Sequence, residues 1–124
     1  MSLTNEVFRY PYPPSWWIYY TITKPDEFKR AEDYTTRPVV LMFSADWNEA
    51  CKVMKKPFRD MALARRNDAV FCLVDIEKLK KDSTIVAKYR VEALPTFVLL
   101  KNSGEKERVV GNKVEEFQAM GRKI

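Results

Sequence analysis

The sequence predicts an α/β domain in which a central mixed β-sheet carries helices on both faces. Residues 39–43 and 69–74 are continuous apolar runs, which indicate strands buried on both faces. The segments that follow these runs have apolar residues at the spacing of amphipathic helices. The chain has 124 residues, of which 46% are apolar, and this length and composition suit one domain with a substantial core.

The remaining elements are placed by composition and by residues that begin or end helices. Residues 16–22 are rich in β-forming side chains and predict the first strand. A helix is expected after Thr23 as N-cap, because Pro25 and Asp26 suit a first helical turn. A long helix is expected over residues 49–66, with Pro57 bending or breaking it. The rest of the chain predicts a helix at 83–90, a strand at 96–101, a turn at 102–104, a strand near 108–110 and a helix at 113–123.

The chain divides into an aromatic, proline-rich N-terminal arm, residues 1–15, and a domain over residues 16–124. Pro11, Pro13 and Pro14 exclude a helix in the arm and disfavour a central strand. Tyrosine and tryptophan are typical interface residues, so the arm is a candidate contact for a second copy or another protein. Residues 16–20 are expected to fold back on the edge of the domain.

Two segments carry the chemistry expected of this chain. The first, Phe-Ser-Ala-Asp-Trp-Asn-Glu-Ala-Cys, covers residues 43–51, and the second, Ala-Leu-Pro-Thr-Phe, covers residues 93–97. The first resembles the active-site segment of the thioredoxin family, where a buried strand ends in Trp-Cys-x-x-Cys at the start of a helix. The second resembles the Pro-Thr loop opposite that site. The resemblance runs from about residue 22 to the C-terminus and implies a thioredoxin fold with a cis-proline loop at Pro95.

The resemblance also shows what this chain lacks. Asn48 holds the place of the attacking cysteine, and Cys51 matches the second, resolving cysteine. Asparagine cannot attack a disulfide, but it is among the best N-cap residues, so the helix start is expected to be intact. The family's buried proton-accepting aspartate corresponds to Met42, and the lysine that partners it corresponds to Phe71. Dithiol catalysis is therefore expected to be lost.

The two cysteines allow several interpretations. Cys51 is expected to be buried and unreactive, since burial in apolar surroundings raises a thiol pKa. A reactive Cys51 is the alternative. Cys72 falls within a predicted buried strand and is expected to act as a small core residue. A disulfide between Cys51 and Cys72 is a further alternative.

The leading functional hypothesis is a thioredoxin-like binding or accessory module without dithiol activity. Its groove for a protein or extended peptide would be formed by residues at the helix start and the proline loop, namely Trp47, Asn48, Cys51, Leu94, Pro95 and Thr96. One alternative is a monothiol disulfide oxidoreductase or isomerase that acts through Cys51. Another is a scaffold subunit that uses residues 8–20 and the predicted helix at residues 49–66, which is rich in basic residues, as contact surfaces.

Charge and composition bear on partners and location. The net charge is +5, and residues 49–68 contain six basic and three acidic residues. An acidic partner is one explanation, and a solvated helix face is the other. No nucleic-acid-binding module is recognised, and no cofactor or metal site is predicted. No apolar run has the length of a membrane span, and no secretory signal pattern is visible. An intracellular setting, such as the cytoplasm, and a link to redox homeostasis are expected.

Overall fold

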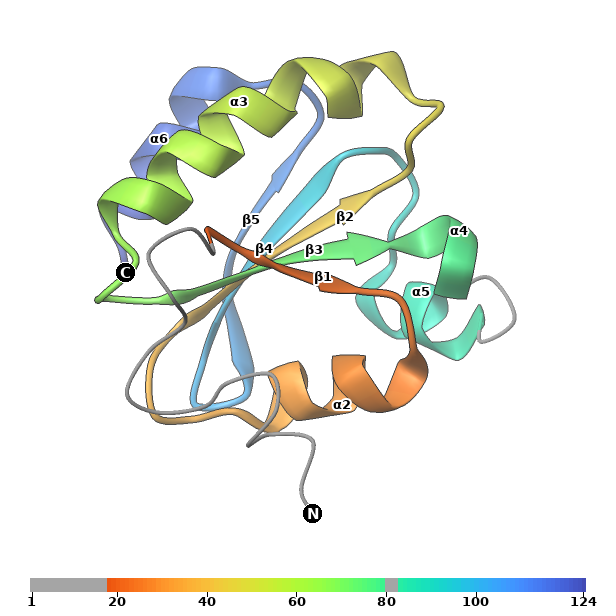
Figure 1. Cartoon of the computed structure of the whole chain (residues 1–124), viewed down its shortest axis with the longest axis horizontal. Coiled ribbons are helices and arrows are strands. Elements are labelled where there is room, and N and C mark those ends of the chain that lie inside the picture. The colour runs from red at the N-terminus through yellow and green to blue at the C-terminus, as the bar shows by residue number, and fades with distance from the viewer. Residues whose placement is uncertain (1–17, 80–82) are drawn as a thin grey trace.

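The structure, a computed structural model, describes residues 18–79 and 83–124, and these form a five-stranded sheet with helices on both faces (Figure 1). The predicted arm and Trp16 and Trp17 lie outside the described residues. No helix in the two described ranges is both long and apolar enough to cross a membrane. The elements in order are β1 (Tyr20–Ile22), α2 (Pro25–Asp33), β2 (Val39–Ser44), α3 (Glu49–Ala64), β3 (Val70–Asp75), α4 (Ile76–Leu79), α5 (Ser83–Tyr89), β4 (Thr96–Lys101), β5 (Gly104–Val110) and α6 (Val114–Gly121).

The strand order β1-β3-β2-β4-β5 brings the two predicted site segments together. β1, β3 and β2 run parallel, whereas β4 is antiparallel to β2 and to β5. Phe43, near the end of β2, lies opposite Thr96 at the start of β4. The segments that follow Phe43 and precede Thr96 therefore meet at one end of the sheet. The predicted mixed sheet is confirmed.

The helices cover the sheet in two layers, each with its own core. α2, α4 and α5 pack on one face, and α3 and α6 pack on the other (Figure 1). Successive residues of β2 alternate between the cores, as the two-residue period of a strand requires. Leu41 and Phe43 belong to the first core, and Val40 and Met42 to the second. All five residues of the predicted strand 39–43 are fully buried, as the continuous apolar run indicated.

The beginning of the domain differs from the prediction in two ways. β1 begins at Tyr20, and the described residues before it are not strand. The N-cap of α2 is Lys24, one residue later than predicted. The Glu27 carboxylate accepts hydrogen bonds from the backbone N–H groups of Thr23 and Lys24, at 3.0 and 3.1 Å. Pro25 takes the first helical position, where its missing N–H costs nothing, so the helix starts there.

Pro57 was expected to bend or break the long helix, and the break is wrong, because α3 continues through this residue. A proline inside a helix leaves the carbonyl four residues earlier without its usual donor. Here that carbonyl belongs to Val53, which is exposed, so water can reach this side of the helix. Met54 and Phe58, on either side of Pro57, are fully buried and hold both halves of α3 on the sheet.

Two further differences concern short elements. α4 was not predicted, and the Asp75 carboxylate begins it by accepting from the N–H groups of Glu77 and Lys78, at 3.0 and 3.2 Å. β5 begins at Gly104 rather than near residue 108. The predicted turn before it is confirmed, with positive φ angles of 52° and 66° at Asn102 and Ser103. The other predicted bounds agree within two residues.

Candidate functional site

The candidate site lies where β2 ends and β4 begins. After Ser44 the chain forms a short loop through Trp47, and α3 begins at Glu49. Because Phe43 pairs with Thr96, this loop lies alongside the residues that lead into β4. The Leu94–Pro95 peptide bond in that second segment is cis. The register of two neighbouring strands thus brings together segments about fifty residues apart in the sequence.

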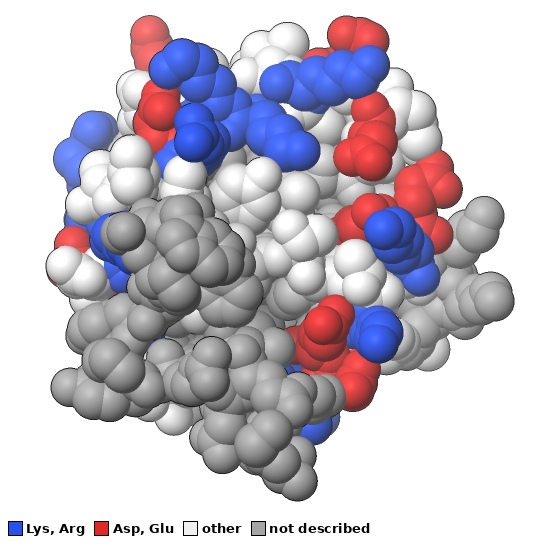
Figure 2. Space-filling view, viewed as in Figure 1, with Lys and Arg blue, Asp and Glu red and all other residues white. Residues whose placement is uncertain are grey.

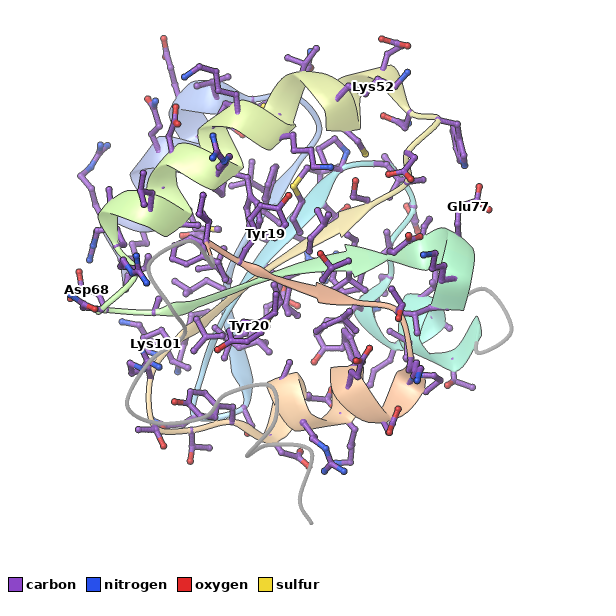
Figure 3. The ribbon with its side chains drawn as sticks, viewed as in Figure 1. Tyr19, Tyr20, Lys52, Asp68, Glu77 and Lys101 are labelled. Carbon is purple, nitrogen blue, oxygen red and sulfur yellow. The ribbon has the colours of Figure 1, made fainter. Side chains whose placement is uncertain are left out.

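Trp47 is the most exposed large apolar side chain among the described residues, at 63% of its surface. Its indole Nε1 donates a hydrogen bond to the carboxylate of Glu77 on α4. Figure 3 shows Glu77 projecting at the edge of the molecule from α4. The indole therefore has a fixed polar contact on one edge while most of the ring faces solvent. Such an amphipathic aromatic group can bind a partner with little loss of side-chain freedom.

Asn48 is the N-cap of α3, as predicted. Its backbone is extended, with φ −87° and ψ 123°, and its side-chain Oδ1 accepts a hydrogen bond from the N–H of Cys51 at 2.9 Å. The amide thus satisfies one of the free N–H groups at the helix start. The side chain is half-buried and has no nucleophilic atom that could attack a disulfide.

Cys51 is buried in the core under α3, with 3% of its surface exposed. The same core contains Met42 and Phe71, which are 0% and 2% exposed. Within residues 18–79 and 83–124 the one buried carboxylate is Glu32, and it bonds the Tyr89 hydroxyl, which lies in the core on the other face of the sheet. No buried acid or base of the described residues therefore lies beside Cys51 to exchange its proton.

The disulfide alternative is wrong. Cys51 and Cys72 are both free and belong to cores on opposite faces of the sheet. Burial raises the pKa of the Cys72 thiol well above its usual range. Cys72 is therefore a protonated core residue at neutral pH, as the sequence indicated.

Burial of Cys51 leads to a prediction about its reactivity. In the folded protein, a thiol reagent such as 5,5′-dithiobis(2-nitrobenzoate) is expected to label Cys51 at least about a hundredfold more slowly than in the urea-unfolded protein, because labelling must await local opening. A Cys72→Ala variant isolates the Cys51 signal, which is followed by absorbance. Rapid stoichiometric labelling of folded protein at neutral pH would contradict burial and support the monothiol enzyme.

The proline and the threonine of the proline loop are both buried. Pro95 is buried, and its carbonyl accepts from the N–H of Gly111 at 2.8 Å. Thr96 is 1% exposed, and its hydroxyl donates to the carbonyl of Ala93 at 2.7 Å. Leu94 is half-buried, and within the described part of the chain its own N–H and C=O form no hydrogen bond. Of the residues expected to line the groove, Trp47 is exposed and Asn48 and Leu94 are half-buried, whereas Cys51, Pro95 and Thr96 are buried.

Comparison with known proteins identifies the family. The family model described as Thioredoxin matches residues 20–122. The chain belongs to the thioredoxin family. Thioredoxin H2-2 of Oryza sativa subsp. japonica is 36% identical over 101 residues, covering 82% of this chain and 72% of the relative. Thioredoxin H2-1 of the same plant is 40% identical over 95 residues, covering 77% of this chain and 66% of the relative. The chain thus spans about two thirds to three quarters of the length of these relatives.

Solved thioredoxin structures have the same fold. Thioredoxin NaTrxh of Nicotiana alata superposes with a TM-score of 0.75 at 28% identity, covering 86% of this chain and 91% of that chain. The thioredoxin of Malassezia sympodialis gives a TM-score of 0.75 at 27% identity, covering 85% and 89% of the two chains. The predicted thioredoxin fold is confirmed.

Two residues that contact the segments of the candidate site were not identified from the sequence. Glu77 follows β3, which is parallel to β2 and ends at the same edge of the sheet. Its position just after a predicted strand could have indicated that it lies near the site. Arg108 on β5 donates to the backbone carbonyls of Tyr89 and Arg90, at 2.5 and 3.4 Å, and so holds the segment that leads to the proline loop. The Arg108 guanidinium also lowers the pKa of the Glu105 carboxyl that it contacts. No sequence pattern indicated that Arg108 holds this segment.

Proposed function

We propose that this chain is a thioredoxin-family binding or accessory module that captures an extended segment of another protein without disulfide exchange. The observation that carries the proposal is the surrounding of Cys51, which is buried among apolar side chains with Asn48 capping the helix above it. A thiol exchange cycle needs an accessible thiolate and a group to accept its proton. Among the described residues, the Cys51 thiol is buried and no buried acid or base lies beside it.

The proposed binding surface combines an aromatic anchor with free main-chain groups. Trp47 offers an exposed ring whose orientation Glu77 fixes. Leu94 offers an N–H and a C=O that no described residue uses. An extended peptide can add to such groups as a short strand, with main-chain hydrogen bonds giving affinity and the neighbouring side chains giving selectivity. Asn48 borders the same surface and adds a polar contact.

Further aspects of the proposal concern partner and location. The partner is a protein or an extended peptide, and acidic character is supported by the basic residues of α3. Self-association through the arm of residues 1–15, separate from the domain of residues 16–124, is an independent proposal that rests on the composition of the arm. Two cysteines that cannot pair with each other suit a reducing compartment, which supports a cytoplasmic or other intracellular location.

Two alternatives have their own support. The relatives are named thioredoxins and Cys51 is retained, which favours the monothiol oxidoreductase or isomerase. The burial of Cys51 argues against it, and thiol labelling decides between the two. The scaffold alternative uses the basic residues of α3, and it predicts partner binding that does not need Trp47.

The test of the proposed function is the loss of peptide binding on truncation of the anchor. Peptides are selected from a random-sequence display library on the wild-type chain, and their affinities are measured by fluorescence anisotropy. Trp47→Ala is expected to weaken binding about tenfold or more, since buried aromatic anchors dominate interface energies. Leu63→Ala is the matched control, because Leu63 is also exposed, at 50%, but lies near the other end of α3. Equal binding by wild type and Trp47→Ala, or a failure to select peptides, would contradict the proposal.

A further inference from the structure

One flank of α3 carries a line of exposed basic side chains, here called the basic stripe. Its members recur at helical spacing, so they lie on one side of the helix: Lys52, Lys55, Lys56 and Arg59. In Figure 2 lysine and arginine atoms gather over α3 at the top of the view, and Figure 3 shows Lys52 near the N-terminal end of the helix. The stripe begins one turn beyond Asn48 and leads away from the candidate site.

Ion pairs within α3 account for two members of the stripe but not for the whole stripe. Like charges three or four residues apart destabilise a helix, and the stripe contains four such pairs. Cations favour the C-terminal end of a helix, yet the last turn of α3 contains none. Lys52 and Lys56 pair with Glu49 and Asp60, at 3.2 and 2.8 Å.

Two members of the stripe remain for a partner. Lys55 and Arg59 are exposed and form no ion pair with a carboxylate in the described parts of the chain. They are successive members of one face, a single helical turn apart. Their charges are therefore available to an external anionic group.

The surface around Trp47 is acidic, whereas the stripe along α3 is basic. Asp46, Glu49 and Glu77 are exposed around Trp47, whereas the basic side chains follow along the helix. A phosphate backbone is negative at every step, so the acidic residues would repel it at the groove. A polypeptide can change its charge from residue to residue, and it therefore fits a surface with both signs better than a nucleic acid does.

We propose that the segment bound in the groove continues across α3 as an acidic stretch, with Lys55 and Arg59 as the specificity-determining contacts. This inference rests on the proposed function and adds the chemistry of the partner. Lys55 lies seven residues beyond Asn48, or about 10 Å along the helix. An extended chain covers that distance in about three residues. The acidic residues of the partner therefore start about three positions from the residue in the groove, and the positions nearer the groove are neutral or basic.

The experiment compares peptide selection on three forms of the chain. A random-sequence display library is selected on the wild type, on Lys55→Glu/Arg59→Glu, and on Lys101→Glu/Lys106→Glu. The control pair makes the same change in net charge away from the site, since Lys101 ends β4, the strand that begins at Thr96 beside the site (Figure 3). Wild-type and control selections are expected to enrich Asp and Glu on one side of the groove-binding residues. The Lys55→Glu/Arg59→Glu selection is expected to lose that enrichment.

Affinities of individual selected peptides give the second measurement. Lys55→Glu/Arg59→Glu is expected to weaken binding of an acidic peptide about tenfold, and the control pair by less than about twofold, because exposed ion pairs are individually weak and reversal replaces attraction by repulsion. Added salt screens these charges, so it is expected to reduce the difference in peptide affinity between the two variants.

Each other outcome overturns the inference in a distinguishable way. Peptides that need Trp47 but show no acidic preference would leave the proposed function intact and remove the role of the stripe. Selected peptides that bind Trp47→Ala as tightly as the wild type would contradict both the proposed function and the role of the stripe. Single-stranded RNA or phosphatidylserine vesicles that bind at physiological salt as tightly as the peptides, and only with Lys55 and Arg59 present, would assign the stripe to a different polyanion.

Discussion

Insulin disulfides are expected to be reduced no faster when this chain is added to dithiothreitol than with dithiothreitol alone. The first step of dithiol exchange is the attack of an exposed thiolate, and Asn48 offers no sulfur for it. Cys51 is 3% exposed and cannot take over the attack without local opening of α3. The turbidity of precipitating insulin chains gives the rate. Turnover comparable to that of a dithiol thioredoxin would contradict the proposed binding function.

Restoring the first sulfur is expected to restore only weak activity. Asn48→Cys would provide a nucleophile at a helix start, where the dipole favours a thiolate. The second step still requires Cys51 to lose its proton, and Met42 and Phe71, which belong to the same core, cannot accept one. Proton transfer by a placed side chain contributes 10²–10⁴-fold, so activity about a hundredfold below that of a dithiol thioredoxin is expected. Asn48→Ser is the control, because serine also caps the helix but adds no sulfur.

The part of the site that follows from local chemistry could be predicted from the sequence. Asn48 was expected to be the N-cap of α3, and this requires only its side-chain amide and the N–H groups of the next turn. The continuous apolar run at residues 39–43 likewise predicted a strand buried on both faces. Each inference depends on a feature contained within a few residues.

The part that depends on distant pairing could not be predicted. Which face of the sheet a strand residue occupies changes with a one-residue shift in register, so the separation of Cys51 from Cys72 required the structure. The bond from Trp47 to Glu77 joins residues thirty positions apart through the parallel pairing of β2 and β3. Thr96 was expected to line the groove, but its pairing with β2 and β5 buries it.

Phe58 gives the largest expected effect on stability. Its spacing from Cys51 and Met54 places the three side chains on one face of α3, and it is fully buried. Its ring centroid lies 5.4 Å from that of Tyr19, 5.8 Å from that of Phe71 and 6.2 Å from that of Phe97. Phe58→Ala is expected to lower the free energy of unfolding by about 3–5 kcal/mol, from the lost burial and the cavity left behind. Urea denaturation gives the value, and an unchanged slope shows that two-state unfolding is retained.

The matched control is Val53→Ala, one and a half turns earlier on the same helix. Val53 is 56% exposed, so its truncation is expected to change the free energy of unfolding by less than about 0.5 kcal/mol. A cost below about 1 kcal/mol for Phe58→Ala would mean that the α3 core is not packed as described. Phe58 lies beneath the helix and not in the groove, so folded Phe58→Ala protein is expected to bind selected peptides with wild-type affinity. Stability and binding would then separate, because Phe58 belongs to the core that holds α3, whereas Trp47 and Leu94 make the proposed contact with the peptide.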